Sequence, residues 1–260
     1  MKVNEYYRAS SLLDAYQKLQ ESPKNAIVAG GLWMKKMGQS YDTLIDISTL
    51  GLNKISESKE EVIVGSMVTQ RDFENSKIVK ALFNDAISFA TREVMGVNFR
   101  NLATIGGSIM GRYPFSDVIT GLLPYDVELE FYPEQKMSLV DYLNYKGKLN
   151  SILVAVHIKK GNGKGFFKKV KTTALDFPIV NIAVAKVNGE FRIAVGARPM
   201  VASLACNAMK YLYEGGKDFA HVAELAVEEL QFLDNKDASK EYRVDLVKVY
   251  VRRGLEEVRK

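Results

Sequence analysis

Two Gly-Gly doublets constrain this chain more than any other sequence feature. The second doublet, Gly106-Gly107, lies within residues 101–117, with the hydroxyls of Thr104 and Ser108 on either side. Paired glycines permit a turn with positive φ and leave no Cβ between the backbone and a ligand. Asp117 ends the stretch and is an anionic acceptor suited to a sugar hydroxyl. The pattern predicts a nucleotide-phosphate site, and a tight turn between two buried segments is the alternative.

The first doublet, Gly30-Gly31, strengthens the prediction of a ligand. Residues 26–29 are apolar and predict a short buried strand, and residues 32–37 predict a short helix. A strand–Gly-Gly–helix junction directs free N–H groups and the positive end of a helix dipole toward one point, which favours an anion. The chain contains no G-x-G-x-x-G, so the dinucleotide fingerprint of Rossmann folds is absent. A strand–helix turn without a ligand is again the alternative.

The rare residue types exclude several kinds of chemistry. Cys206 is the only cysteine among 260 residues, so this chain alone can hold neither an intrachain disulfide nor a cysteine-ligated iron–sulfur cluster. His157 and His221 lie far apart without metal-ligand spacing, which argues against a zinc site or a His-based triad. We therefore expect no metal ligands and no catalytic residues. We interpret both histidines as structural and Cys206 as a core residue.

The composition is that of a globular protein with a mild positive charge. Hydrophobic residues make up 47% and charged residues 26%, and the net charge is +5. That charge favours an anionic ligand or an acidic partner, but the basic residues are scattered and form no nucleic-acid-binding module. No apolar run is long enough to span a membrane, and residues 1–7 lack the apolar core of a signal peptide. We expect a cytoplasmic protein that binds neither nucleic acid nor membrane.

The first 160 residues predict short helices mixed with strands. Ser11 and Thr69 are predicted N-caps, each followed three residues later by an aspartate, for helices over residues 11–21 and just after Thr69. Residues 78–94 predict one helix whose core face carries Leu82, Ala86, Phe89 and Ala90. Further strands are expected at residues 44–47, 61–65, 127–131 and 152–158, and a helix at residues 118–123.

A Gly- and Lys-rich turn at residues 159–165 predicts a domain boundary. Beyond it, residues 179–187 and 190–197 alternate as two strands joined by Asn188-Gly189, a strong hairpin signal. From residue 200 onward the chain reads almost wholly as helix, with breaks at Gly215-Gly216 and residues 234–238. The C-terminal part is therefore expected to combine a small sheet with helices.

Five stretches, in order along the chain, resemble the FAD-binding (medium) subunit of the xanthine dehydrogenase and carbon monoxide dehydrogenase family of molybdenum hydroxylases. They are residues 27–31, residues 64–69, residues 100–107 with Asp117, residues 167–181 and residues 242–255. The resemblance implies an α+β fold in two parts. Residues 1–162 would form a two-lobed FAD-binding domain of the p-cresol methylhydroxylase type. Residues 163–260 would form a small C-terminal domain with a three-stranded sheet and helices.

The resemblance also implies roles for particular residues in binding noncovalent FAD. Backbone N–H groups of the first doublet and its neighbours would wrap the pyrophosphate: Ile27, Val28, Ala29, Gly30, Gly31, Leu32, Trp33 and Met34. A second wall would come from Thr104, Ile105, Gly106, Gly107 and Ser108. Asp117 would accept from the ribose, Leu153 would pack on the cofactor, and Lys169 would pair with flavin or phosphate oxygens. Phe177 would lie near the isoalloxazine ring.

The function implied is that of an electron-transfer subunit. Electrons would pass from a molybdenum cofactor on one partner, through [2Fe–2S] clusters on another, to FAD on this chain and then to NAD or another acceptor. Without partners we expect no turnover beyond diaphorase-type activity. The chain departs from the family pattern just after the first doublet. Leu32 stands where the family usually has Thr or His, and Trp33 stands where it often has Asp. A structural or assembly subunit with a degenerate flavin site is therefore the alternative, and a nucleotide-binding enzyme of another class is a third.

Overall fold

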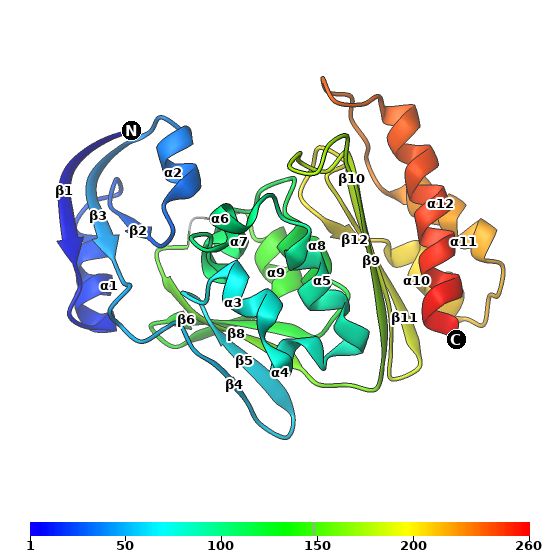
Figure 1. Ribbon diagram of the computed structural model, residues 1–260, viewed down its shortest axis with the longest axis horizontal. Helices are drawn as coiled ribbons and strands as arrows, with labels where there is room; N and C mark the ends of the chain where they lie inside the picture. Colours follow the sequence, from blue (N-terminus) through cyan, green and yellow to red (C-terminus); the bar gives the residue numbers. More distant parts are fainter. Residues whose placement is uncertain (148) are drawn as a thin grey trace.

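The computed structural model describes residues 1–147 and 149–260, and three parts follow one another along its long axis (Figure 1). The N-terminal lobe has a parallel three-stranded sheet of order β1-β3-β2. Its apolar core is small. It contains Ala9, Ala15, Ile45 and Ile47, together with Ile152, which the central lobe contributes. The elements are β1 (Lys2–Arg8), α1 (Leu12–Gln20), β2 (Ala26–Val28), α2 (Leu32–Lys36) and β3 (Ser40–Asp46).

The central lobe is built on an antiparallel five-stranded sheet of order β4-β5-β8-β6-β7. Its strands are β4 (Ile55–Glu57), β5 (Glu61–Gly65), β6 (Val127–Tyr132), β7 (Gln135–Ser138) and β8 (Ile152–Lys159). Short helices pack against this sheet over a large apolar core. They are α3 (Gln70–Asn75), α4 (Lys77–Lys80), η1 (Phe83–Asp85), α5 (Ala86–Arg92), α6 (Val97–Arg100), α7 (Ile105–Met110), α8 (Asp117–Leu122) and α9 (Leu139–Asn144).

The C-terminal domain has a sheet of order β12-β11-β10-β9, with three long strands and a fourth of only two residues. Alternate residues of β10 enter two different cores: Ile182 and Val184 face the C-terminal helices, whereas Ala183 and Ala185 face the central lobe. The sheet is thus packed on both faces, which explains its continuous apolar sequence. The elements are β9 (Gly163–Val170), β10 (Val180–Val187), β11 (Glu190–Gly196), β12 (Ser203–Leu204), α10 (Cys206–Tyr213), α11 (Phe219–Glu229) and α12 (Lys240–Arg259).

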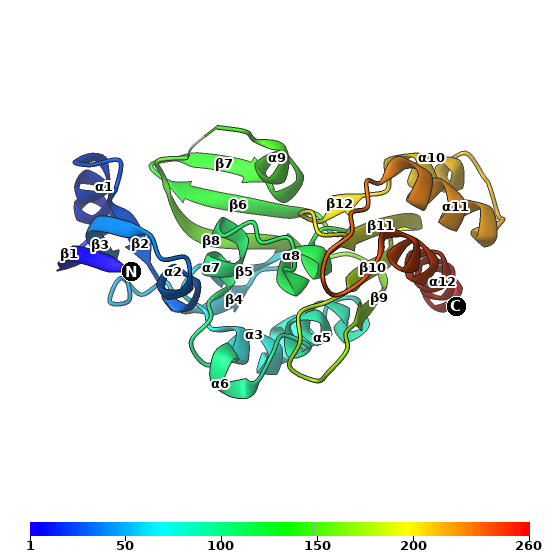
Figure 2. The ribbon, with the colours of Figure 1, turned by 90° about the horizontal axis from the view of Figure 1, so that it is seen from above.

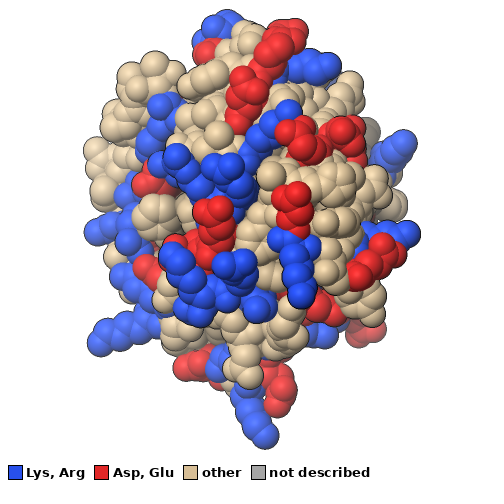
Figure 3. All heavy atoms as spheres, turned by 90° about the vertical axis from the view of Figure 1, so that its right-hand side faces the viewer, with Lys and Arg blue, Asp and Glu red and all other residues tan. Residues whose placement is uncertain are grey.

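The three parts lie in chain order, with the N-terminal lobe and the C-terminal domain at opposite ends of the central lobe (Figure 2). On the side of the molecule formed by the C-terminal domain, basic and acidic side chains are interspersed (Figure 3). In the part of the chain that the structure describes, no helix is long and apolar enough to cross a membrane. The same residues contain no cluster of side chains suited to a metal ion.

Local signals in the sequence account for many of these elements. The hydroxyls of Ser11 and Thr69 accept from the N–H groups three residues later and cap α1 and α3, as predicted. Asn188 and Gly189 have φ angles of 51° and 91° and join β10 to β11, which confirms the hairpin. The α+β fold with a two-lobed first part and a small sheet-and-helix C-terminal domain is therefore confirmed.

Two local predictions are wrong. The helix expected over residues 78–94 is broken into α4, η1 and α5, because Phe83, Asn84 and Asp85 all have positive φ angles. The break rotates α5 so that Ile87 and Ala90 face the core while Phe89 is 39% exposed beneath the guanidinium of Arg92. Cys206, predicted in the core, is exposed at the first residue of α10.

Candidate functional site

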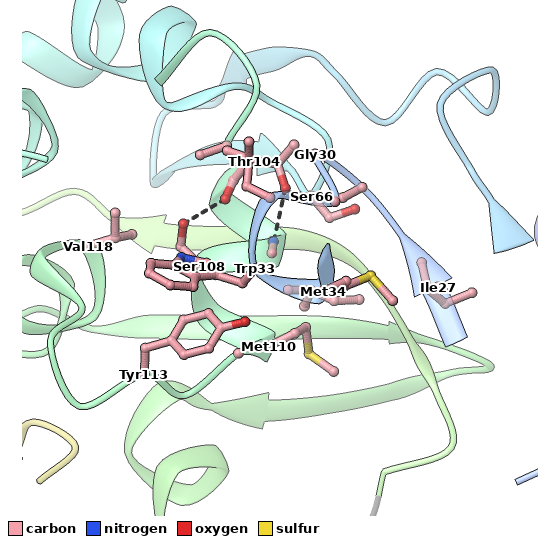
Figure 4. A pocket seen from close by; sticks show the side chains of 18 of the residues that line it. Ile27, Gly30, Trp33, Met34, Ser66, Thr104, Ser108, Met110, Tyr113 and Val118 are labelled. Atoms are coloured by element: carbon pink, nitrogen blue, oxygen red, sulfur yellow. Dashed lines mark hydrogen bonds between the residues drawn. The ribbon is translucent and has the colours of Figure 1, made fainter. Parts of the chain in front are cut away.

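The glycine doublets lie beside a cavity of about 370 Å³ where the N-terminal and central lobes meet, and the C-terminal domain contributes Lys169 and Phe177 to its wall. This volume is in the range of ligand-binding pockets. Figure 4 shows Gly30, Ser66 and Thr104 gathered on one side, with the rings of Trp33 and Tyr113 close together on another. The lining is mainly apolar with a few polar groups, the composition expected of a site for a large cofactor.

The first glycine of each doublet is required by close packing. A Cβ on Gly30 would collide with the carbonyl oxygen of Leu102, and a Cβ on Gly106 would lie 2.6 Å from the carbonyl oxygen of Ser66. Leu102 lies shortly before the second doublet in the sequence. The packing of Gly30 against the Leu102 carbonyl therefore brings the two doublets close together. The Gly30 contact joins the N-terminal lobe to the central lobe, whereas the Gly106 contact packs α7 against the end of β5 within the central lobe.

The second glycine of each doublet leaves space at the cavity. Gly31 has a φ of 65°, a conformation that favours glycine, and it precedes the first residue of α2. No hydrogen bond within residues 1–147 and 149–260 engages the N–H groups of Gly30 and Gly31. A Cβ on Gly107 would meet only the hydroxyl of Thr104, at 3.0 Å. Unengaged main-chain donors next to open space suit an anionic group such as a pyrophosphate.

Two buried polar atoms on the central wall of the cavity lack a partner. Ser66 and Gln70 are 4% and 3% exposed, and the Ser66 hydroxyl and the Gln70 Oε1 make no hydrogen bond to any described residue. The other end of the Gln70 amide donates from Nε2 to the Ser108 hydroxyl over 2.8 Å. Unpaired buried polar atoms are rare in folded proteins, and beside a cavity their expected partner is a water or a ligand.

Asp117 and Lys169 are both nearly inaccessible and pair with each other. The Lys169 ammonium donates to the Asp117 carboxylate over 2.8 Å and to the Glu93 carbonyl over 3.0 Å, and the Asn181 amide donates to the other Asp117 oxygen over 2.8 Å. Burial raises the pKa of the Asp117 carboxyl, and the charge of Lys169 opposes that rise. In the ligand-free chain these two charges engage each other and Asn181. Their predicted contacts to the ribose and to phosphate oxygens stay predictions.

An aromatic cluster closes one side of the cavity. Trp33 lies 5.5 Å from Tyr113, 5.1 Å from Phe115 and 5.6 Å from Phe177 between ring centroids. Phe99 completes the cluster at 6.4 Å in an edge-on arrangement. Helix α2 has no buried residue, so these ring contacts help to fasten it, together with the packing of Gly30 against Leu102. Sequence reasoning missed Phe99, Tyr113 and Phe115, although the Tyr-Pro-Phe run just beyond the second doublet was a visible signal.

The structure brings most of the predicted site residues together. Those that border the cavity are Ile27, Ala29, Gly30, Gly31, Leu32, Trp33, Met34, Thr104, Gly106, Gly107, Ser108, Asp117, Leu153, Lys169 and Phe177. Val28 and Ile105 do not border it. Val28 pairs with Asp46 in the sheet, where neighbouring side chains point to opposite faces, and Ile105 lies on the face of α7 that is wholly buried in the central core.

Comparisons with known proteins agree with this geometry. Residues 1–158 match the model of the FAD binding domain in molybdopterin dehydrogenase, and residues 165–258 match that of the CO dehydrogenase flavoprotein C-terminal domain. The chain therefore belongs to the family of FAD-binding subunits of molybdopterin dehydrogenases.

Relatives of known name lie within the same family. The chain is 25% identical to the putative xanthine dehydrogenase FAD-binding subunit XdhB of Escherichia coli K12, over 97% of this chain and 94% of that one. It is 27% identical to the glyceraldehyde dehydrogenase medium chain of Sulfolobus acidocaldarius, over 69% of this chain and 68% of that one.

Solved structures share the fold. A chain of carbon monoxide dehydrogenase from Hydrogenophaga pseudoflava superimposes with a TM-score of 0.88 at 22% identity, over 98% of this chain and 96% of that one. A chain of quinoline 2-oxidoreductase from Pseudomonas putida 86 superimposes with a TM-score of 0.86 at 24% identity, over 98% of this chain and 96% of that one. The predicted family and fold are thus confirmed.

The residues present fit FAD. Main-chain N–H groups at Gly30 and Gly31 suit the pyrophosphate, and the unpaired Ser66 hydroxyl and Gln70 Oε1 suit hydroxyl and N–H groups elsewhere on the cofactor. The rings around Trp33 offer apolar faces for planar heterocycles. Lys169 is the only lysine or arginine on the described lining and is already paired, so the binding of a phosphate would depend on the backbone.

Proposed function

We propose that this chain is the flavin subunit of a multi-subunit molybdenum, iron–sulfur and flavin oxidoreductase. The observation that carries the proposal is the cavity at which the two glycine doublets meet in a chain of this family. The names of its relatives, a xanthine dehydrogenase FAD-binding subunit and a glyceraldehyde dehydrogenase medium chain, support a role beside other subunits. Because Cys206 is the only cysteine, iron–sulfur clusters and the molybdenum cofactor belong to partner chains.

In this proposal the chain binds and orients FAD, and the bound flavin supplies one- and two-electron redox chemistry. Gly30 and Gly31 donate main-chain N–H groups to the pyrophosphate, and Gly107 leaves room for it. The rings of Trp33 and Phe177 exclude water from one side. The chain lies between [2Fe–2S] clusters on a partner, which receive electrons from the molybdenum centre, and a final acceptor such as NAD. Any catalytic residue for the organic substrate belongs to the molybdenum-bearing partner.

The direct test is FAD binding by the purified chain. We expect the chain to quench flavin fluorescence on titration and to retain yellow FAD through gel filtration. Gly107→Asp should abolish retention, because it places a carboxylate at the cavity beside the phosphates. Gly107→Ala is the matched control, since its Cβ meets only the Thr104 hydroxyl, and it should retain FAD. A wild-type chain without flavin binding contradicts the proposal.

A structural subunit with a degenerate flavin site is the second candidate. The observation in its favour is the bulky indole of Trp33 on the cavity wall, where the family usually has an acidic residue. A chain that assembles with its partners but never takes up FAD would establish this candidate. Oxidation of NADH with a dye as acceptor by the FAD-loaded chain would instead support both the flavin role and NAD as the acceptor.

A further inference from the structure

Gln70 holds the best-defined unpaired polar group of the cavity. It is the first residue of α3 and only 3% exposed, and its backbone N–H donates to the Ala103 carbonyl over 2.7 Å. That bond ties Gln70 to the segment just before the Gly106-Gly107 doublet, where Thr69 and Thr104 also form a β-bridge. Its side chain is therefore held beside the proposed cofactor.

Hydrogen-bond direction determines which end of the Gln70 amide is unpaired. The single proton of the Ser108 hydroxyl is donated to the Thr104 carbonyl over 2.7 Å. Toward Gln70 this hydroxyl can therefore only accept, so the 2.8 Å contact must come from the amide Nε2. The Oε1 is thus directed away from Ser108. It remains a buried acceptor that no donor among the described residues reaches.

We propose that Gln70 Oε1 accepts a hydrogen bond from a hydroxyl or N–H group of FAD, an inference that rests on the proposed function. A phosphate oxygen cannot be its partner, because both atoms are acceptors. Gln70 thus offers a free acceptor on this wall, whereas the Asp117 carboxylate is held by Lys169 and Asn181. The Ser66 hydroxyl is the second unpaired group on the same wall. Because Oε1 is itself buried in the ligand-free wall, the proposal requires the end of the side chain to rotate on binding, a change common at ligand sites.

A buried water is the competing account of these atoms. A water that bridged Ser66 and Gln70 would satisfy both without any ligand. The two accounts predict different FAD affinities when Gln70 is replaced by methionine, which has a similar length and no hydrogen-bonding amide. Under either account the FAD-free variant loses the Nε2 bond to Ser108 and is somewhat less stable. Loss of a water partner would leave FAD affinity unchanged, whereas loss of a ligand partner would weaken FAD binding.

The experiment titrates FAD into wild type, Gln70→Met and the exposed control Gln39→Met, and measures thermal unfolding of each without FAD. We expect Gln70→Met to raise the FAD Kd about tenfold or more, because a buried donor on the ligand is left unpaired. Its unfolding midpoint should fall only as far as that of Ser108→Ala, which removes the same hydrogen bond, and Gln39→Met should match wild type in both measurements. Titration of both chains with riboflavin and with ADP then locates the donor on the flavin half or on the adenosine half of FAD. Weaker binding of either compound by Gln70→Met than by wild type supports the proposal.

An unchanged FAD Kd in Gln70→Met overturns this inference while leaving the proposed function intact. Absence of FAD binding by wild type itself overturns both, so the two failures are distinguishable. If Gln70→Met does not fold, Ser108→Ala provides the second test, because it removes the bond that directs Oε1 away from Ser108. We expect Ser108→Ala to fold and to weaken FAD binding about threefold, a smaller loss since Oε1 is retained. Wild-type affinity in that folded variant contradicts the proposal.

Discussion

The two walls of the cavity are stabilised in different ways, although each carries one glycine doublet. The N-terminal lobe has a small apolar core and many polar contacts, such as those of Asp46 with Tyr6, Arg8 and the Ser48 N–H. The central lobe has a large apolar core and a buried carboxylate, Glu74, paired with arginine. Because apolar burial is the dominant source of stability, we expect the central wall to be the more stable and the N-terminal wall to open more readily.

The central wall should lose most stability when its buried ion pair is broken. Glu74 is 1% exposed and lies 2.9 Å from Arg100, which also donates to the carbonyls of Val94 and Met95 at the cavity. Glu74→Ala leaves Arg100 buried and unpaired, so we expect a loss of about 3–5 kcal/mol in the free energy of unfolding by urea. Arg71, the half-exposed second partner of Glu74, is the control, and Arg71→Ala should cost less than about 1 kcal/mol. Equal losses would refute the distinction.

The next largest difference in stability is expected between alanine variants of the two glycines of the second doublet. In Gly106→Ala the new Cβ meets the Ser66 carbonyl and side chain at 2.6 and 2.7 Å, so overpacking should cost about 1–3 kcal/mol in thermal unfolding. Gly107→Ala should be nearly neutral, because the new Cβ has one neighbour and alanine favours the helix by up to about 1 kcal/mol. The assignment of packing to Gly106 and of ligand space to Gly107 fails if the two variants are equally destabilised.

Trp33→Ala should loosen the N-terminal wall while leaving the central lobe intact. The indole contacts rings from three other segments, and such pairs are worth about 0.5–1.5 kcal/mol each. We expect faster amide hydrogen exchange in α2 and the Gly30-Gly31 turn, with unchanged exchange in β8. Trp33→Phe should restore most of the protection. Faster exchange in both lobes would mean that the walls unfold as one unit.

Acid should affect the N-terminal lobe first, with the smallest effect of this series. Burial raises the pKa of Asp46, but hydrogen bonds from Ser48, Tyr6 and Arg8 outweigh it, and the net shift is downward. A carboxyl with a lowered pKa stabilises the fold above its unfolded value, near 3.9, and that contribution is lost as pH falls through the folded value. Proteolysis between pH 5 and 3 should therefore cleave β1 and β3 before the central strands. Asp46→Asn should reduce this pH dependence.

Much of the fold follows from local patterns. The caps at Ser11 and Thr69, the Asn188-Gly189 hairpin and the strand–Gly-Gly–helix junction are each decided by residues within a few positions of one another. Local hydrogen bonds and φ preferences act at this range, so sequence reasoning captured them. The break at residues 83–85 was missed because nothing in the composition of that segment requires positive φ angles. The exposure of Phe89 follows from that break.

The candidate site shows the same division between short and long range. The sequence by itself pointed to the Gly30-Gly31 and Gly106-Gly107 doublets and excluded an iron–sulfur cluster ligated by cysteines of this chain alone. Only the tertiary structure decided that Asp117 pairs with Lys169, 52 positions away, and that Gln70 retains the unpaired acceptor. Which glycine packs and which leaves space also depended on the approach of distant backbone at Leu102 and Ser66. Charge pairing and close packing depend on distances in space, which the order of residues along a chain does not specify.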